Sequence, residues 1–448
     1  MATTYLSKTF AQAGNRRTFT ISYWIKMGYV STTADGGLFH AAQDGSNSDD
    51  LYIHTGRLNF SGYYGSTAYQ VRTSAKYRDL SGWYHHVIRF DTTQSTASDR
   101  LRLYVNGELQ TALDSNTYPS QNLETTYINT ARQHTIGSFA NGSLPNGAFN
   151  GSMSHFHFCD GYSYGADSFG SVDNVTGEWK INTSPSVSYG TNGFFILKDG
   201  NSVTDQSGQG NNWSVGGGTL TKTEDNPSCV FATLNVLDGN LGNSTFTYGN
   251  NRFNSETNSN VTYATSTLGM TSGKFYFEAK LETAADHNYI GIADLPSPST
   301  SHYFGNTAYE YGYKSSSGDK KNNNTSTSYG NTYTTNDIVM CAVDLDNLKV
   351  YFGKNGTWQN SGDPTSGATG TGSAFTITAP SSTTGGQYFF CVADGTTTNN
   401  SRWQTNFGNG YFGTTAVSSA GTNASGIGIF EYDVPTGFTA LSTKGLNE

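Results

Sequence analysis

Two expected loops of this chain place tyrosine side chains beside amides and hydroxyls. They read NFSGYYGSTAYQ at residues 59–70 and HYFGNTAYEYGY at residues 302–313. Aromatic faces can stack on the apolar side of a sugar or a protein surface, while amides and hydroxyls form directional hydrogen bonds. The alternative is that these tyrosines cover a sheet or pack against a neighbouring subunit. The candidate ligand-binding residues are Tyr63, Tyr64, Tyr69, Tyr303, Tyr309 and Tyr311.

The best pair of carboxylates for cleaving a glycosidic bond is Glu278 and Glu282, in the stretch FYFEAKLE. Glycosidases hold two carboxyl groups about 5–5.5 Å apart for retention, or about 6.5–9.5 Å apart for inversion. On one strand these two glutamates share a face, but at roughly 3.3 Å per residue their backbones are about 13 Å apart. The alternating Glu-x-Asp-x-x-Glu signature is absent as well. We therefore assign no catalytic residue and interpret both as solvent-facing carboxylates that flank Lys280.

The histidines do not form an obvious metal site. His85 and His86 are adjacent in an expected strand, so they point to opposite faces and cannot chelate one ion together. His155 and His157 share a face, but their alternation with phenylalanines favours a half-buried strand. No phosphate-cradling loop precedes a helix.

The elements that must position these residues are predicted to be strands. The segment HHVIRFD at 85–91 is followed by RLRLYVNG at 100–107, and DIVMCAVDLDNLKVYFGKNG at 337–356 repeats the pattern. Each copy predicts two antiparallel strands, the second closing at an Asn-Gly turn with positive φ. This repeated pattern predicts two related β-modules in tandem.

Composition agrees with an all-β chain. The 448 residues are 14% aromatic and 13% charged, with 53 glycines, so strand formers and turn formers are both abundant. The net charge of −9 argues against a nucleic-acid partner. No run approaches the roughly 18 apolar residues of a membrane span, so we expect no membrane insertion.

The four cysteines favour synthesis in a reducing cytoplasm. Cys341 and Cys391 lie inside apolar runs and Cys159 and Cys229 stand alone, with no CxxC pair. This pattern predicts neither a zinc site nor a disulfide framework. The first residues also lack the apolar core of a secretion signal.

Strand signals divide the chain into three parts. We expect a first β-sandwich at residues 1–165, a turn-rich connector with short strands at 166–235 and a second β-sandwich at 236–448.

These segments carry resemblances to known families. The first block, with TISYWIK at 20–26, WYHHVIRFD at 83–91, LRLYVNGEL at 101–109 and FNGSMSHFHFCDG at 149–161, resembles a laminin-G-like, concanavalin A-type jelly roll. The second, with GKFYFEAKL at 273–281, YIGIAD at 289–294, the strand pair above and FFCVADG at 389–395, resembles a SPRY-type β-sandwich. The resemblances imply an all-β fold of two tandem antiparallel sandwiches.

The connector is similar to segments of tailed-bacteriophage virion proteins. The segments are FGSVDNVTGEWKI at 169–181, SYGTNGFFI at 188–196, DQSGQGNNWSV at 205–215 and DNPSCVFATLN at 225–235. This resemblance implies a protein made in the bacterial host cytoplasm and displayed on the virion surface, with other virion proteins as partners. Such folds host lectins, hydrolases and structural modules alike, so the site must be argued separately.

The laminin-G-like resemblance also implies a possible calcium site, because such modules sometimes bind Ca²⁺ through rim loops. The expected loop AQDGSNSDD at 42–50 offers Asp44, Asp49 and Asp50 as oxygen ligands. It lacks the spacing of a dedicated calcium loop, so a solvated acidic turn is favoured and no cofactor is otherwise expected.

Together these observations predict a non-enzymatic virion protein, a tail fibre or spike adhesin that binds a host envelope glycan or receptor through sandwich rim loops. A head-decoration or capsid-fibre role is the alternative, because the first sandwich begins about twenty residues from Met1 and leaves no room for an anchoring domain. A polysaccharide depolymerase is third. Anchoring through a sandwich face or the connector predicts a symmetric homo-oligomer such as a trimer.

Overall fold

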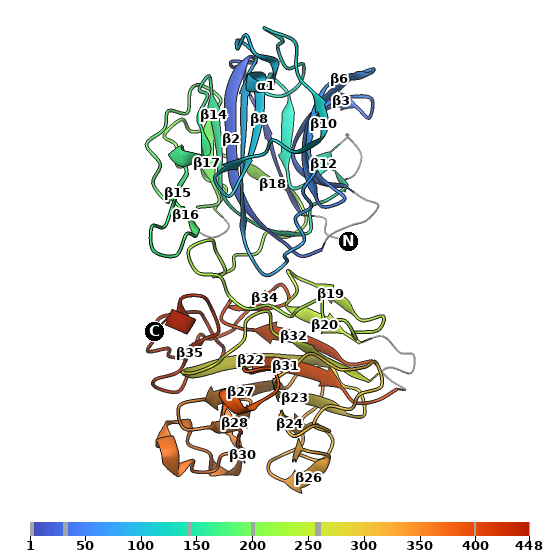
Figure 1. Ribbon diagram of the computed structural model, residues 1–448, viewed down its shortest axis with the longest axis vertical. Coiled ribbons are helices and arrows are strands. Elements are labelled where there is room, and N and C mark those ends of the chain that lie inside the picture. The colour runs from blue at the N-terminus through green and yellow to red at the C-terminus, as the bar shows by residue number, and fades with distance from the viewer. Residues whose placement is uncertain are drawn as a thin grey trace. The chain divides into compact units, whose positions relative to one another are not determined.

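The computed structural model describes residues 4–29, 35–140, 145–198, 202–255, 261–397 and 400–447. It confirms the all-β prediction and divides the chain into two compact units, Met1–Lys222 and Thr223–Glu448 (Figure 1). Among the described residues, no helix is long and apolar enough to cross a membrane.

The first unit contains two large antiparallel sheets. The eight-stranded sheet has the order β10 (Leu113–Thr117), β6 (Thr67–Thr73), β5 (Arg57–Tyr64), β4 (Asn47–His54), β3 (Asp35–Asp44), β11 (Gln133–Ile136), β1 (Tyr5–Thr9) and β18 (Ser214–Gly217). The six-stranded sheet has the order β17 (Phe194–Ile196), β14 (Gly151–Asp160), β2 (Thr18–Met27), β7 (Tyr84–Asp91), β8 (Leu101–Val105) and β9 (Glu108–Leu109). The smaller elements are β12 (Phe139–Ala140), β13 (Pro145–Asn146), β15 (Gly170–Val172), β16 (Trp179–Ile181), the short helix α1 (Ala97–Arg100) and the 3-10 turn η1 (Ala166–Ser168).

Phenylalanines join these two sheets. Phe19 on β2 stacks on Phe90 at 4.7 Å between ring centroids and meets Phe60 of the opposite sheet edge-to-face at 6.3 Å. All three rings are fully buried. The alternation of apolar and polar residues along the strands therefore encloses an aromatic core between the sheets.

Residues after β14 cover the outer face of the six-stranded sheet. Trp179 on β16 donates a hydrogen bond from Nε1 to Nδ1 of His85 on β7, at 2.9 Å. Tyr189 reaches His157 on β14, with 2.9 Å between its hydroxyl and Nδ1. In the residues that follow, β18 pairs with β1. Much of the segment expected to be a connector thus packs as part of the first unit.

The second unit also pairs two sheets. The nine-stranded sheet runs β19 (Thr245–Thr247), β20 (Arg252–Asn254), β32 (Arg402–Asn406), β22 (Lys274–Thr283), β27 (Ile338–Asp344), β28 (Lys349–Lys354) and β29 (Thr357–Trp358), with β30 (Phe375–Thr376) on β28 and β35 (Thr439–Ala440) parallel to β22. The six-stranded sheet runs β21 (Thr262–Thr265), β31 (Phe389–Asp394), β23 (Asn288–Ala293), β24 (Glu310–Lys314), β25 (Asp319–Asn322) and β26 (Thr325–Ser328). The remaining elements are β33 (Tyr411–Phe412), β34 (Thr415–Ala416) and the 3-10 turns η2 (Gln359–Ser361), η3 (Pro364–Thr369), η4 (Pro380–Ser382) and η5 (Gly445–Asn447).

The core of the second unit is again aromatic between its sheets. Phe277 on β22 contacts Phe390 on β31 with 4.3 Å between centroids, and Tyr313 on β24 stacks on Phe352 of β28 at 5.5 Å. Both pairs cross from one sheet to the other, as expected for a β-sandwich.

The two predicted strand pairs are confirmed. Strand β7 pairs antiparallel with β8, and β27 pairs antiparallel with β28. The predicted turns have positive φ at both central residues, 48° and 85° at Asn106 and Gly107 and 48° and 80° at Asn355 and Gly356. A left-handed conformation at both positions is what selects Asn-Gly there.

Candidate functional site

The six predicted tyrosines differ widely in exposure. Tyr63 and Tyr303 are exposed, at 40% and 42% of their surface. Tyr64 and Tyr309 are half-buried. Tyr69 and Tyr311 are buried, and assigning them as ligand contacts is wrong, because their rings belong to the two cores. Tyr69 packs on Phe60 and Phe90, and Tyr311 packs on Phe375 and Tyr388.

The first tyrosine stretch is also not a rim loop. Residues 59–70 form most of the β5–β6 hairpin, so side chains alternate between core and surface. Tyr69 faces inward and Tyr63 outward. A hairpin rich in Gly, Ser and Asn resembled a loop in composition, although its apolar residues follow the period of a strand.

Buried Asp49 on β4 holds this hairpin in place. Its Oδ1 accepts hydrogen bonds from the hydroxyls of Tyr64 and Tyr69, and its Oδ2 accepts from the backbone N–H groups of Tyr127 and Ile128 at 2.7 and 3.0 Å. Burial raises the pKa of Asp49, although these four donors oppose the shift. The carboxylate therefore ties two strands to residues 127–128 and has no oxygen left facing solvent.

The three predicted calcium ligands do not converge. Asp44 accepts hydrogen bonds from the backbone N–H of Ser46 and the amide of Asn47. Asp50 pairs with His40 and points to the opposite face of β4 from Asp49. The 42–50 stretch is a strand hairpin rather than a loop. Within the ranges that the structure describes, no three His, Cys, Asp or Glu side chains gather to hold a metal.

The carboxylate pair considered for hydrolysis is also separated. Glu278 is completely buried, so its interpretation as a solvent-facing carboxylate is wrong. It accepts hydrogen bonds from Tyr276, from the amide of Asn406 and from the backbone N–H groups of Glu431 and Tyr432. Glu282 instead forms an ion pair with Arg252 on β20, which lies beyond the intervening strand β32.

The histidine interpretations are partly confirmed. His85 and His86 have different partners, Ser22 and Trp179 for the first and Tyr23 for the second, as expected for opposite faces. His155 and His157 both contact Phe195 and therefore share a face. They are buried rather than half-buried, because a bulge in β14 and the residues after it cover that face.

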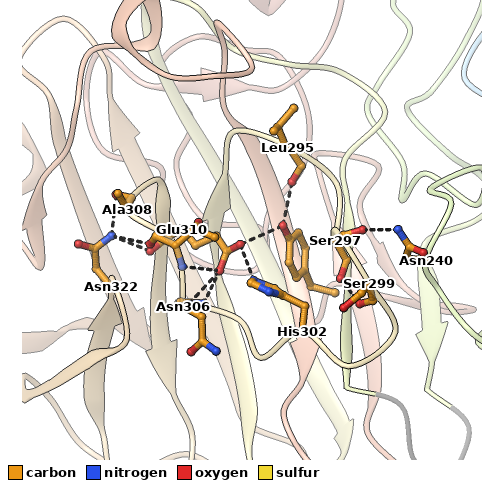
Figure 2. A network of polar contacts seen from close by, with 12 residues as sticks. Asn240, Leu295, Ser297, Ser299, His302, Asn306, Ala308, Glu310 and Asn322 are labelled. Atoms are coloured by element: carbon orange, nitrogen blue, oxygen red, sulfur yellow. Dashed lines mark hydrogen bonds and ion pairs between the residues drawn. The ribbon is translucent and has the colours of Figure 1, made fainter.

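The second tyrosine stretch contains a preorganised loop. Residues 294–309 connect β23 to β24, and Figure 2 shows the buried carboxylate of Glu310 at the base of this loop. Its Oε2 accepts hydrogen bonds from the backbone N–H groups of Gly305, Asn306 and Thr307, at 2.7, 3.1 and 3.4 Å. A carboxylate that satisfies three consecutive N–H groups fixes the path of the loop without further secondary structure.

The other oxygen of Glu310 holds the opposite side of the loop. Oε1 lies 2.7 Å from Nε2 of His302 and accepts from the hydroxyl of Tyr263 at 3.3 Å. The same hydroxyl donates to the carbonyl of Leu295 at 3.0 Å. Burial acts to raise the pKa of Glu310. The hydrogen bond from His302, the charge of His302 and the N–H donors of the loop outweigh this effect, so the pKa of Glu310 lies below its usual value.

Residues of β25 and of a turn before β19 complete the support (Figure 2). The amide of Asn322 on β25 donates to the carbonyls of Ala308 and Glu310, both at 2.9 Å. Nζ of Lys321 donates to Oδ1 of Asn306 at 2.8 Å. The amide of Asn240 donates to the carbonyl of Ser297 at 2.9 Å. We call residues 294–309 with these supports the Glu310 loop.

The Glu310 loop presents an aromatic and an apolar side chain to solvent. Tyr303 and Leu295 are both exposed on it, beside the polar backbone and hydroxyls of Ser299 and Ser301. The sequence singled out Tyr303 but not Glu310 or His302. A lone glutamate at the start of the aromatic strand EYGYK was the available signal, since a carboxylate on a buried strand needs several donors.

Two units, each built of two packed antiparallel sheets, define a tandem β-sandwich protein. Residues 2–162 match the concanavalin A-like lectin/glucanases superfamily, in its laminin-G-like form, and residues 274–393 match the SPRY domain. The chain thus contains a concanavalin A-like domain followed by a SPRY domain, as the sequence predicted.

Solved structures of other proteins are similar to parts of this chain. The SPRY domain of human HERC1 is 17% identical, with 35% of this chain and 87% of that chain covered and a TM-score of 0.27. A human SPRY domain is 14% identical, with coverage of 34% and 91% and a TM-score of 0.25. Stonustoxin is 14% identical, with coverage of 39% and 27% and a TM-score of 0.28. No curated protein sequence matches the chain.

Proposed function

We propose that this chain is a non-enzymatic surface protein of a tailed-bacteriophage particle, and that it serves as a tail fibre or spike adhesin for a host envelope glycan or receptor. Its two domains belong to folds that commonly bind other molecules. The bacteriophage part of the proposal rests on the resemblance of segments between residues 169 and 235 to virion proteins.

The observation that carries the binding role is the exposure of Tyr303 on the Glu310 loop. A binding loop gains affinity when its conformation is fixed before the ligand arrives, because less entropy is lost on binding. Buried Glu310 and partly buried His302 supply that fixation, and Tyr303 supplies an aromatic face. Tyr63 on the first unit is a second exposed aromatic contact of the same proposal.

The proposed setting adds partners. Other virion proteins would hold the chain on the particle, and a symmetric homo-oligomer, such as a trimer, would present several copies of each loop. Several weak sites on one particle bind a repetitive polysaccharide with an avidity far above that of one site.

The test is binding of labelled protein to host cells and to their purified envelope polysaccharides, with reducing ends measured in the same samples. We expect binding without release of reducing ends, and weaker binding by Tyr303→Ala. The matched control is Tyr162→Ala, because Tyr162 is equally exposed, at 41%, but stacks on Tyr164 in the first unit.

Three outcomes would contradict parts of the proposal. Release of reducing ends would indicate a depolymerase. Binding to capsid shells but not to cells would indicate the head-decoration role. Equal binding by Tyr303→Ala and the wild type, with both folded, would remove the Glu310 loop from the site.

A further inference from the structure

A row of polar side chains crosses the outer face of the nine-stranded sheet in the second unit. Arg252 on β20 lies opposite Gln404 on β32, and Gln404 lies opposite Lys280 on β22. The residues that alternate with them point into the core; they are Phe253, Trp403, Ala279 and Leu281. The row therefore faces away from the core.

Glu282 is the centre of this row. It accepts two hydrogen bonds from Arg252, from Nε at 2.6 Å and from Nη2 at 2.9 Å, and a third from the amide of Gln404 at 2.9 Å. Its side chain remains 28% exposed. The hydrogen bonds from Arg252 lower the pKa of Glu282, and the hydrogen bond from Gln404 and the charge of Arg402 act in the same direction. Partial burial acts to raise this pKa but is outweighed. A fixed, ionised carboxylate beside a fixed amide can accept from and donate to the hydroxyls of a sugar.

Tyr248 supplies an aromatic face at the end of the row. It is 46% exposed, and the guanidinium of Arg252 lies 5.8 Å from its ring centroid. A Cβ at Gly413 would lie 3.1 Å from both the Tyr248 ring and the Gln404 amide, so Gly413 packs against both side chains. Cation–π contact and close packing hold the ring beside the polar row.

The row carries excess positive charge on an acidic chain. Arg252, Lys280 and Arg402 contribute three positive charges and Glu282 one negative charge, whereas the whole chain has a net charge of −9. The guanidinium of Arg402 donates through Nε to Oδ1 of Asn254 at 3.0 Å. Within the described ranges, neither Arg402 nor Lys280 forms an ion pair with a carboxylate.

We propose that Tyr248, Arg252, Lys280, Glu282, Arg402 and Gln404 form a site for a uronic-acid unit of an acidic polysaccharide, separate from the Glu310 loop. The ring of the sugar stacks on Tyr248, Glu282 and Gln404 bind its hydroxyls, and Arg402 with Lys280 binds its carboxylate. This inference rests on the proposed glycan-binding function and names a ligand class for it.

The experiment measures binding of the full chain to polygalacturonate, with dextran as the neutral control, at low and high salt. We expect binding to polygalacturonate alone, weaker at high salt because exposed charges are screened. Tyr248→Ala and Arg402→Gln should each raise Kd about tenfold, the loss of one aromatic or charged anchor. Tyr248→Phe keeps the stacking face and should bind as the wild type does.

A second basic residue distinguishes a site from general attraction of polyanions. Lys349 is a cation on β28 of the same sheet, where its Nζ donates to Thr376, and Lys349→Gln should leave Kd unchanged. The inference is overturned if Lys349→Gln weakens binding as much as Arg402→Gln, if folded Tyr248→Ala binds normally, or if the wild type ignores polygalacturonate. If the wild type ignores polygalacturonate but still binds cells through Tyr303, the proposed adhesin function stands and only this inference fails. If the wild type binds neither polygalacturonate nor cells, the proposed function fails as well.

Discussion

At the scale of single residues, buried carboxylates do most of the positioning in both units. Asp49 in the first unit and Glu310 in the second accept hydrogen bonds from consecutive backbone N–H groups and from aromatic or histidine side chains. An unpaired buried N–H costs about 1–3 kcal/mol, so such a carboxylate fixes local conformation strongly. Neither residue needs to touch a ligand to determine where the neighbouring tyrosines lie.

Replacing Glu310 with alanine should loosen the Glu310 loop. Three N–H groups lose their acceptor, so the free energy of unfolding should fall by about 3 kcal/mol. Hydrogen exchange at the amides of Gly305, Asn306 and Thr307 should become faster. Glu310→Gln retains an acceptor and should cost clearly less; equal stability of both variants would refute the role assigned to this carboxylate.

Replacing Tyr69 with phenylalanine should destabilise the first unit through Asp49. The variant keeps the packing on Phe60 and Phe90 but removes one of four donors to a fully buried carboxylate. We expect a loss of about 1–2 kcal/mol in chemical denaturation. Tyr63→Phe removes an exposed hydroxyl and serves as the control, with a change expected within about 0.5 kcal/mol.

At the scale of elements, the residues after β14 are integral to the first unit. Trp179 lies over the Asn106–Gly107 turn, and a Cβ added to Gly107 would come within 2.4 Å of its ring. Gly107 also has φ of 85°, which only glycine adopts readily. The turn thus ends strand β8 and also contacts Trp179 of the segment that covers the sheet.

Gly107→Ala should therefore lower the free energy of unfolding by more than the replacement of a glycine whose only special feature is a positive φ. Gly65→Ala is the matched control, because Gly65 has φ of 70° and open space around its Cβ position. We expect about 1 kcal/mol for Gly65→Ala and a further 1–3 kcal/mol for Gly107→Ala from the clash. Similar losses in the two variants would show that Trp179 does not press on this turn.

Much of the fold could be predicted from sequence because the signals for strands and turns lie within a few neighbouring residues. The apolar run in HHVIRFD and the Asn-Gly turns determine the β7–β8 and β27–β28 pairs locally. The loop assignments at 42–50 and 59–70 were wrong because Gly, Ser and Asn occur both in turns and in strands at a sheet margin. Burial of Tyr69, Tyr311 and Glu278 depends on the opposite sheet and on distant residues, which no local pattern reports.

The candidate site was harder to predict than the fold. Tyr303 could be chosen by residue type, but the support of its loop by Tyr263, Glu310 and Asn322 arises from three strands that meet only in the folded sheet. The Arg252–Glu282–Gln404 row likewise joins three strands that are far apart in sequence. Cross-strand register, which sequence alone leaves open, determines both arrangements.

At the scale of the whole molecule, the two units should respond to acid in opposite directions. Burial lowers the pKa of His85 and His86 to about 3 and of His134 to about 4, all in the first unit. A lowered pKa means that the unfolded chain takes up protons first, so stability falls as pH drops below about 6.5. In the second unit, burial raises the pKa of Glu278 to about 7 and of Asp238 to about 6. Their protonation favours the folded state, so this contribution is lost as pH rises through those values.

Lowering the pH from 7.5 to 5.5 should therefore destabilise the first unit relative to the second. Each of the three histidines should cost the first unit on the order of 1 kcal/mol, whereas Glu278 should add a similar amount to the second. Hydrogen exchange followed separately in each unit checks this. Glu278→Gln should reduce the gain of the second unit, and parallel changes in both units would contradict the assignment.

The most direct test of the account is binding of the labelled wild type and Tyr303→Ala to purified host envelope polysaccharide, with reducing ends measured alongside. We predict saturable binding by the wild type, clearly weaker binding by the folded variant and no release of sugar. Sugar release, or identical binding by the two proteins, would contradict the central claim that this chain recognises its ligand through a preorganised loop without cleaving it.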